Sequence, residues 1–395
     1  MTLDVAKMNS INRGRSLLFR LRVTGVGRFI RDVLDVVGSA SLYRIRVGGM
    51  RQFVRDVREV FCAGLKRPRK GPVIHQIGEP GGRLRVLYIH SGWAIYNVGL
   101  RWFSDLEGVS CTMLSKDDFV ANPALELSHD IVVYGYTHLM RRCQHLGLKR
   151  PCIVCVHDPL ELYEQVLEWK QTAPYSHAID LCKKAWRVVC VSHEMQQHLA
   201  RAGIAAVRVP TASLLHATTS TKVKCRGATD LPLRAITVGR IYRRKRFELF
   251  NEITWMSQRA RLPVTFKAKL DQCPMPEQEY IAYLDSADVY IVTSFQEGGP
   301  LPAMDAMRRG LVVLSTRVGQ MPEIIEDGVS GFLCDDLSEF IERLRLLSRD
   351  REVLQRMRHR SLARILEVRS DVVVHRALMA ALDFAERGTV RLKSH

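Results

Sequence analysis

Residues 286–332 constrain the fold of this chain most, because a short apolar run, a glycine-rich turn and a helical segment follow one another there. The run at residues 288–293 is rich in Val and Ile, which is typical of a buried parallel strand. Two prolines stand where a first helical turn tolerates them, and Gly310 is a typical helix end. The stretch therefore predicts a strand, a turn and a helix, with another strand at residues 312–315.

The turn before this helix carries Glu297, Gly298 and Gly299. Backbone N–H groups at a helix N-terminus point beyond the strand end, and they favour an anion such as a diphosphate. Asp305 lies eight residues after Glu297, about two turns into the helix, so one carboxylate can face a ligand while the other reaches back toward it. The same turn also fits a plain connection in an α/β domain, and the pattern alone leaves both interpretations open.

The spacing across this stretch resembles the donor-site signature of glycosyltransferase family 4, a group of retaining enzymes with the two-domain GT-B fold. In that family, a Glu and a second Glu eight residues later are followed by a helix end, a strand and a glycine-rich run. The matching positions here are Glu297, Asp305, Ala306, Met307, Gly310, Val312, Val313, Gly319, Glu323, Asp327, Gly328, Gly331 and Leu333. Asp305 departs from the pattern, because it is one methylene shorter than the Glu of the family.

The resemblance implies a role for each residue at the turn. Glu297 is expected to be catalytic by binding the hydroxyls of the donor sugar, and Asp305 is expected to contact the donor ribose. The other residues implied at the donor are Pro300 and Leu301 for the sugar or ribose, and Gly298 and Gly299 for the diphosphate.

A basic segment follows the strand predicted at residues 234–238, and it contains Arg240 and Lys245. On its own, such a segment also fits a solvated loop. The family has an Arg and a Lys at these two positions, so the resemblance implies that both bind the donor diphosphate. Arg suits a bidentate phosphate contact and Lys acts as a point charge. Arg246 stands where a Gly usually follows.

Two further strand ends carry candidate residues. Gly92 follows the strand predicted at residues 85–90, where family members have a Gly-Gly pair beneath the donor phosphates. His157 follows the strand predicted at residues 152–156. A histidine in that place often only forms structural hydrogen bonds, but the resemblance places it beside the transferred sugar and the acceptor as a catalytic residue.

Strands alternate with helical stretches along the chain, which indicates a parallel, doubly wound α/β sheet. The resemblance implies the GT-B architecture, with two Rossmann-like domains that face each other across a cleft and a basic helical N-terminal extension. We expect an extension and linker at residues 1–72, an acceptor domain at residues 73–225, a donor domain at residues 226–370, and a helix crossing back to the first domain at residues 371–395.

The formal charge of +18 indicates attraction to polyanions or to an anionic membrane surface. It concentrates in residues 1–70, which hold sixteen Lys or Arg against five Asp or Glu. The basic amphipathic pattern there suits a membrane interface, a protein partner or packing on the catalytic domain. No apolar run of eighteen residues and no signal-peptide core are present, so we expect a cytoplasmic protein, peripheral to the inner face of the membrane. The ten cysteines are predicted to be reduced thiols.

No Asp-x-Asp metal signature is present, and basic side chains with a helix N-terminus can neutralise a diphosphate. We therefore expect metal-independent catalysis without a cofactor. The resulting hypothesis is a glycosyltransferase that moves a sugar from a nucleotide-diphosphate sugar to a glycan or lipid-linked acceptor of a surface polysaccharide, such as lipopolysaccharide. The alternative is a catalytically inactive GT-B homologue that binds nucleotides or acts as a scaffold. Nucleic acid is not an expected partner, because no aromatic stacking platform accompanies the basic residues.

Overall fold

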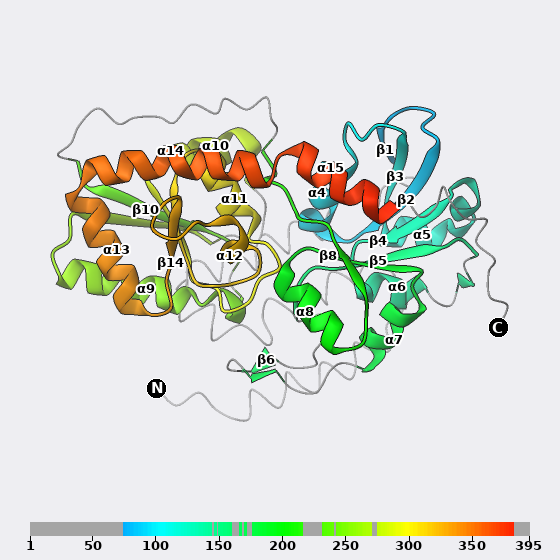
Figure 1. Ribbon diagram of the computed structural model, residues 1–395, viewed down its shortest axis with the longest axis horizontal. Coiled ribbons are helices and arrows are strands. Elements are labelled where there is room, and N and C mark those ends of the chain that lie inside the picture. The colour runs from blue at the N-terminus through cyan, green and yellow to red at the C-terminus, as the bar shows by residue number, and fades with distance from the viewer. Residues whose placement is uncertain are drawn as a thin grey trace, which may run out of the picture. The chain divides into compact units, whose positions relative to one another are not determined.

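The computed structural model describes residues 74–143, 146–147, 149–159, 166–167, 170–171, 176–215, 231–240, 242–270 and 275–382 (Figure 1). The predicted basic extension at residues 1–72 lies outside this part of the chain, as does its predicted role in binding a membrane surface or a protein partner. Residues 216–230, which include the boundary predicted between the acceptor domain and the donor domain, also lie outside it.

The N-terminal sheet has seven strands in the order β1-β3-β2-β4-β5-β8-β9 within the described residues. Its neighbouring strands are parallel, except that β1 pairs antiparallel with β3 at the edge. The strands are β1 (His75–Gly78), β2 (Leu84–His90), β3 (Val109–Ser115), β4 (Ile131–Tyr134), β5 (Cys152–Val156), β8 (Arg187–Cys190) and β9 (Ala206–Arg208), and a separate antiparallel pair is β6 (Val166–Leu167) with β7 (Lys170–Gln171).

Helices connect these strands along the chain, as expected for a doubly wound sheet. They are α4 (Gly92–Phe103), α5 (Lys116–Ala121), α6 (Thr137–Cys143), α7 (Ser176–Lys184) and α8 (His193–Arg201), with a 3-10 helix η1 (Pro123–Ser128).

The C-terminal sheet has five parallel strands in the order β11-β10-β12-β13-β14 within the described residues. These strands are β10 (Leu233–Val238), β11 (Val264–Lys269), β12 (Val289–Val292), β13 (Val312–Ser315) and β14 (Gly331–Leu333). The helices are η4 (Arg243–Lys245), α9 (Phe247–Arg259), α10 (Glu277–Asp285), α11 (Leu301–Arg308), α12 (Met321–Ile324), α13 (Leu337–Arg349), α14 (Arg351–Val368) and α15 (Asp371–Leu382).

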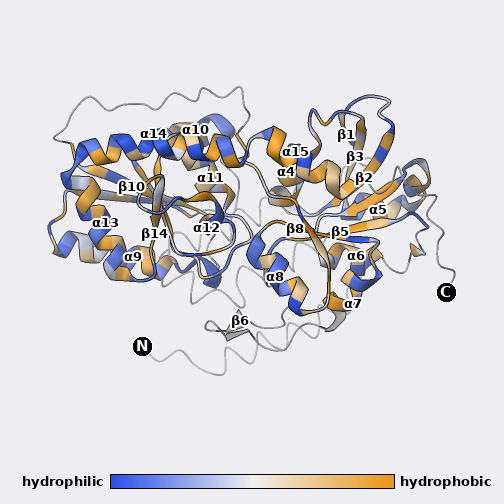
Figure 2. Cartoon of the chain, viewed as in Figure 1, coloured by the Kyte–Doolittle hydropathy of each residue, from blue (hydrophilic) through white to orange (hydrophobic). Residues whose placement is uncertain are grey.

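Both faces of the central strand β12 are buried, which explains its continuous run of apolar residues. Val289 and Ile291 pack into a cluster with residues of α9 and α13, whereas Tyr290 and Val292 pack into a cluster with residues of α10 and α11. Figure 1 shows these helix pairs on opposite sides of the sheet. In Figure 2, hydrophobic colours dominate β5 and β8, and hydrophilic colours mark the outer turns of α8 and α14.

The last described helix, α15, packs against α4 and β9 of the N-terminal sheet. Arg187 at the start of β8 donates hydrogen bonds to the carbonyl oxygens of Ala380 and Ala381, in the last described turn of α15. Among the described helices, none has both the length and the apolar content that a membrane span requires.

The structure confirms the α/β class and the parallel sheets that the sequence predicts. The strands predicted from apolar runs are present to within one or two residues at each end. The apolar runs do not predict β1, β3 or the short strands β6, β7, β9 and β14. β1 is a half-exposed edge strand, and β3 mixes Ser, Thr and Cys with its apolar residues. The Cys152 and Cys155 side chains point into different core clusters from β5, as strand alternation predicts.

Arg246, which precedes α9, has left-handed backbone angles (φ 46°, ψ 50°) that a residue with a Cβ atom adopts only with strain. We expect Arg246→Gly to raise the free energy of unfolding by about 1 kcal/mol, because glycine relieves this strain at some cost in chain entropy. Thermal unfolding measures the effect. Glu252→Gly, at an exposed interior position of the same helix, is the control and should lower stability by about 1 kcal/mol. A similar loss in both variants would contradict the prediction.

Candidate active site

The carboxyl ends of β10 and β12 are neighbours in the C-terminal sheet, at the point where the strand order reverses. Open parallel sheets bind ligands at such a switch point. Two loops meet there, because the Thr293 hydroxyl donates to the carbonyl oxygen of Lys245 (2.8 Å) and the Phe295 amide donates to that of Arg244 (2.9 Å). The basic segment after β10 and the acidic turn after β12 are therefore held against each other.

Glu297 lies on the turn between β12 and α11, and only 4% of it is exposed. Its Oε1 atom accepts a hydrogen bond from the Ser294 hydroxyl (2.7 Å) and pairs with the Lys245 ammonium. Arg244 Nη1 lies 3.4 Å from Oε2. Burial opposes ionisation of Glu297, but the charges of Lys245 and Arg244 outweigh it and hold the pKa below its usual value. The carboxylate is thus ionised and compensated on both oxygens.

The glycines of this turn are positions of close packing. A Cβ atom on Gly298 would lie 1.9 Å from the carbonyl oxygen of His157, so the turn packs directly against the end of β5. A Cβ atom on Gly299 would lie 2.3 Å from the amide nitrogen of the Gln320 side chain. Pro300 precedes α11, and Leu301, its first residue, is part of the hydrophobic core. Diphosphate binding by the two glycines, and a donor contact by Pro300 and Leu301, remain predictions.

His157 lies at the carboxyl end of β5 and is buried. Its ring stacks on Trp102 (centroids 6.0 Å apart) and contacts Tyr136 (5.0 Å). Burial lowers its pKa to about 4, so the imidazole is neutral at pH 7. Asp158, the next residue, is also buried and lies 3.4 Å from Arg244 Nη1. The structure thus brings His157 beside the Glu297 turn, and its predicted place beside the transferred sugar and the acceptor stays a prediction.

Aromatic and imidazole rings continue from His157 along the carboxyl ends of β4 and β2. Tyr136 contacts His138 (5.2 Å between centroids), and the Ser91 hydroxyl lies 3.4 Å from His138 Nε2. His90, at the end of β2, has its pKa lowered to about 4 by burial and by His75. Gly92 begins α4 beside these groups, is exposed and has a positive φ of 70°.

Asp305 lies on α11 and is fully buried. Its Oδ1 atom accepts hydrogen bonds from the Ser213 hydroxyl (2.6 Å) and the Leu214 amide (2.7 Å), and Oδ2 accepts one from the Tyr280 hydroxyl (2.9 Å). Burial raises its pKa, although these hydrogen bonds act in the opposite direction. In this conformation the Asp305 side chain binds residues 213–214, which follow β9, the last strand of the N-terminal sheet in chain order. A contact to a donor ribose remains a prediction.

Arg240 lies two residues beyond the end of β10 and is exposed, and its contact with a diphosphate also remains a prediction. Three residues around Glu297 are not among the predicted site residues: Ser294, Arg244 and Asp158. Each had a signal in the sequence, since Ser294 precedes Glu297 by three residues, Arg244 adjoins Lys245 and Asp158 adjoins His157. Among the described residues, no group of three or more His, Cys, Asp or Glu is placed to hold a metal ion, and metal independence stays a prediction.

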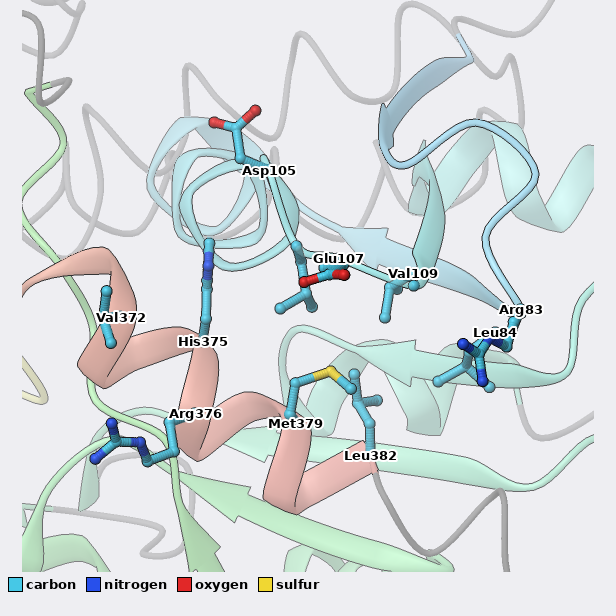
Figure 3. A pocket seen from close by; sticks show the side chains of 12 residues that line it. Arg83, Leu84, Asp105, Glu107, Val109, Val372, His375, Arg376, Met379 and Leu382 are labelled. Carbon is cyan, nitrogen blue, oxygen red and sulfur yellow. The ribbon is translucent and has the colours of Figure 1, made fainter.

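A pocket of about 550 Å³ lies beside the amino ends of β2 and β3 in the N-terminal sheet. It is lined by the starts of β2 and β3 and by α15, from which His375, Met379 and Leu382 contribute their side chains (Figure 3). Because ligands of parallel sheets bind at the carboxyl ends of the strands, this pocket is separate from the candidate active site.

Comparison with known families decides what the segment around Glu297 is. Residues 273–364, which include the β12 turn, α11 and most of α14, match the family model described as glycosyl transferases group 1. This segment is a group 1 glycosyltransferase domain. The match excludes Lys245 and the whole N-terminal sheet, so it covers the acidic side of the site only.

Curated relatives match over short stretches. The amylovoran biosynthesis glycosyltransferase of Erwinia amylovora is 39% identical over 67 residues, which is 15% of this chain and 16% of that protein. A putative colanic acid biosynthesis glycosyltransferase of Salmonella typhimurium is 32% identical over 116 residues, 27% of this chain and 29% of that protein. D-inositol 3-phosphate glycosyltransferase of Corynebacterium glutamicum is 39% identical over 62 residues, 16% of this chain and 15% of that protein. The matches therefore span less than a third of each relative.

Solved structures resemble this chain over most of its length. Sucrose-phosphate synthase of Thermosynechococcus elongatus has a TM-score of 0.58 at 16% identity, covering 77% of this chain and 99% of that chain. Anabaena HepE, solved in complex with UDP and glucose, has a TM-score of 0.55 at 12% identity, covering 76% and 100%. At these identities the likeness establishes the fold, which is GT-B.

His157 generates a prediction on pH dependence. Its pKa of about 4 in the folded protein lies below the ordinary value of 6.5. The neutral ring therefore contributes its full stability above pH 6.5, and this contribution is lost progressively as the pH falls toward 4, because the unfolded chain takes up the proton first. As the pH falls from 6.5 to 5, the free energy of unfolding should decrease less in His157→Gln than in wild type. We expect this difference to be about 1 kcal/mol per pH unit. Denaturant titrations at several pH values measure this. His193→Gln, at an exposed position, controls for loss of an imidazole, and an acid sensitivity of His157→Gln equal to wild type would refute the prediction.

Proposed function

We propose that this protein is a retaining, metal-independent glycosyltransferase that moves a sugar from a nucleotide-diphosphate sugar to a glycan or lipid-linked acceptor in surface polysaccharide biosynthesis. The observation that carries the proposal is the pairing of Lys245 with the buried Glu297 at the switch point of the C-terminal sheet. The two curated relatives named for amylovoran and colanic acid biosynthesis support the polysaccharide class.

The donor site follows from the charges at this switch point. Arg240 and Lys245 bind the diphosphate through charge-assisted hydrogen bonds, each of which contributes about 1.5–3 kcal/mol. The N-terminus of α11 adds the partial positive charge of the helix dipole. Glu297 accepts hydrogen bonds from the sugar hydroxyls and orients the anomeric carbon, so that it positions the donor and is not a general base. HepE was solved with UDP-glucose, which makes UDP the first nucleotide to test.

The acceptor side follows from the carboxyl ends of β2, β4 and β5. Neutral imidazoles and the Tyr136 ring lie there, and the apolar C–H faces of a sugar ring pack well on such ring faces. His157, next to the Glu297 turn, marks the end of this row where the transferred sugar meets the acceptor hydroxyl. In a retaining transfer, the departing phosphate oxygen accepts the proton of that hydroxyl.

One observation favours a second candidate, a nucleotide-binding or scaffolding subunit without catalysis. Asp305 stands where the family has Glu, and its carboxylate is occupied by the Ser213, Leu214 and Tyr280 donors. A protein of this kind would bind a nucleoside diphosphate and its sugar without turnover, which separates the two candidates.

Glu297→Gln tests the proposed function, because it keeps the shape of the side chain but removes the charge that holds the sugar. We expect turnover of the nucleotide sugar to fall by at least about 100-fold, while the protein stays folded at the assay temperature and its affinity for the nucleoside diphosphate stays within a small factor of wild type. Radiolabelled sugar transfer or donor hydrolysis measures turnover. Glu326→Gln, at an exposed position near α12, is the matched control. Near-normal turnover in Glu297→Gln would remove this residue from the active site.

A further inference from the structure

Arg244 is placed between two buried carboxylates that come from different sheets. Its Nη1 atom lies 3.4 Å from Glu297 Oε2, on the turn after β12, and 3.4 Å from Asp158 Oδ2, after the end of β5. The Asp158 side chain is 10% exposed and that of Glu297 5% exposed, whereas Arg244 is 25% exposed. One guanidinium therefore compensates two carboxylates that are largely removed from water.

The proposed function makes conflicting demands on Lys245 and Glu297. The Lys245 ammonium must contact the donor diphosphate, and Glu297 must accept hydrogen bonds from the sugar, but the two side chains are paired with each other here. When the diphosphate draws Lys245 away, Glu297 loses its closest cation. A buried carboxylate without a cation is strongly destabilised, so another group must hold it in place and ionised.

Arg244 can supply that charge without a large movement. Its carbonyl oxygen accepts the Phe295 amide hydrogen bond, so its backbone is fixed to the same turn that carries Glu297. At 3.4 Å, its contact with Oε2 is longer than an ordinary charge-assisted hydrogen bond, and a small shift can shorten it. Asp158 neutralises the guanidinium from the side of the N-terminal sheet.

We propose that Arg244 is a positioning residue for Glu297, held by Asp158, which keeps the carboxylate oriented toward the donor sugar once the diphosphate has taken Lys245. This inference rests on the proposed function. It separates the roles of two adjacent cations: Lys245 binds phosphate, and Arg244 acts on the sugar through Glu297. It also makes the sugar contact depend on Asp158, a residue of the other sheet.

A first experiment tests the Asp158–Arg244 pair without any ligand. Denaturant unfolding is measured for wild type, Asp158→Asn, Arg244→Gln and the double variant. We expect each single change to lower the denaturant concentration at the midpoint of unfolding. The midpoint of the double variant should be no lower than that of the less stable single variant, because both changes break the same pair. Additive losses would show that the two side chains are not coupled and would overturn the proposal.

A second experiment separates sugar from phosphate binding. Calorimetry with UDP, GDP, ADP, CDP and their glucose conjugates first finds the pair that wild type binds best. The ratio of the Kd of the nucleoside diphosphate to that of its glucose conjugate then reports the sugar contact. In Arg244→Gln we expect the nucleoside diphosphate Kd to stay within about twofold and this ratio to fall about tenfold or more. Lys245→Gln should do the reverse, and Arg243→Gln controls for loss of a charge at an exposed neighbour.

The outcomes distinguish this proposal from the proposed function. Equal losses of both affinities in Arg244→Gln would make Arg244 a phosphate ligand, and unchanged affinities would make it irrelevant to the donor; either result overturns the proposal. Failure of wild type to bind any nucleotide of the panel would refute the proposed function, and the positioning role with it. A structural role alone would lower the melting temperature of Arg244→Gln without changing the ratio.

Discussion

The burial of the Glu297 carboxylate is the constraint around which the candidate site is built. A carboxylate that is almost entirely removed from water must have cations and hydrogen-bond donors around it, or it takes up a proton. Lys245, Arg244 and Ser294 supply them, and the backbone contacts of Thr293 and Phe295 hold the basic loop where it can do so. A ligand that carries more negative charge than one carboxylate can replace Glu297 on Lys245, and a diphosphate is such a ligand.

Close contacts join the two sheets at this place, so the site includes residues of both. Gly298 packs on the His157 carbonyl, which leaves no room for a side chain. Glu323, a residue of the glycine-rich run, pairs with Arg208 at the end of β9 and with Arg369 after α14. Asp305 holds the segment that leaves the N-terminal sheet. Gly298 and Asp305, which the resemblance assigns to the donor, thus also contact residues that follow strands of the N-terminal sheet.

The apolar runs predicted the strands, and the pattern after the Glu297 turn predicted a helix. The strand predictions succeed because burial on both faces of a parallel strand requires an unbroken run of apolar residues, and such a run can be recognised directly in the sequence. The partners of the site residues were not predictable, because they depend on which strand ends become neighbours. Arg244 looked like one more residue of a basic loop, and only the pairing of β10 with β12 shows that it reaches Glu297. For Asp305, the sequence showed a shortened side chain, but not that Ser213 and Tyr280 fill the space around it.

In the proposed site, Lys245 and Arg240 bind a donor diphosphate in place of Glu297 and without a metal ion. Calorimetric titration of nucleoside diphosphates in EDTA, with wild type and with the Arg240→Ala, Lys245→Ala double variant, tests it most directly. We expect wild type to bind one nucleotide tightly in EDTA and the double variant, still folded, to bind none. Equal binding by both proteins, or binding by wild type only after a divalent metal is added, would contradict it.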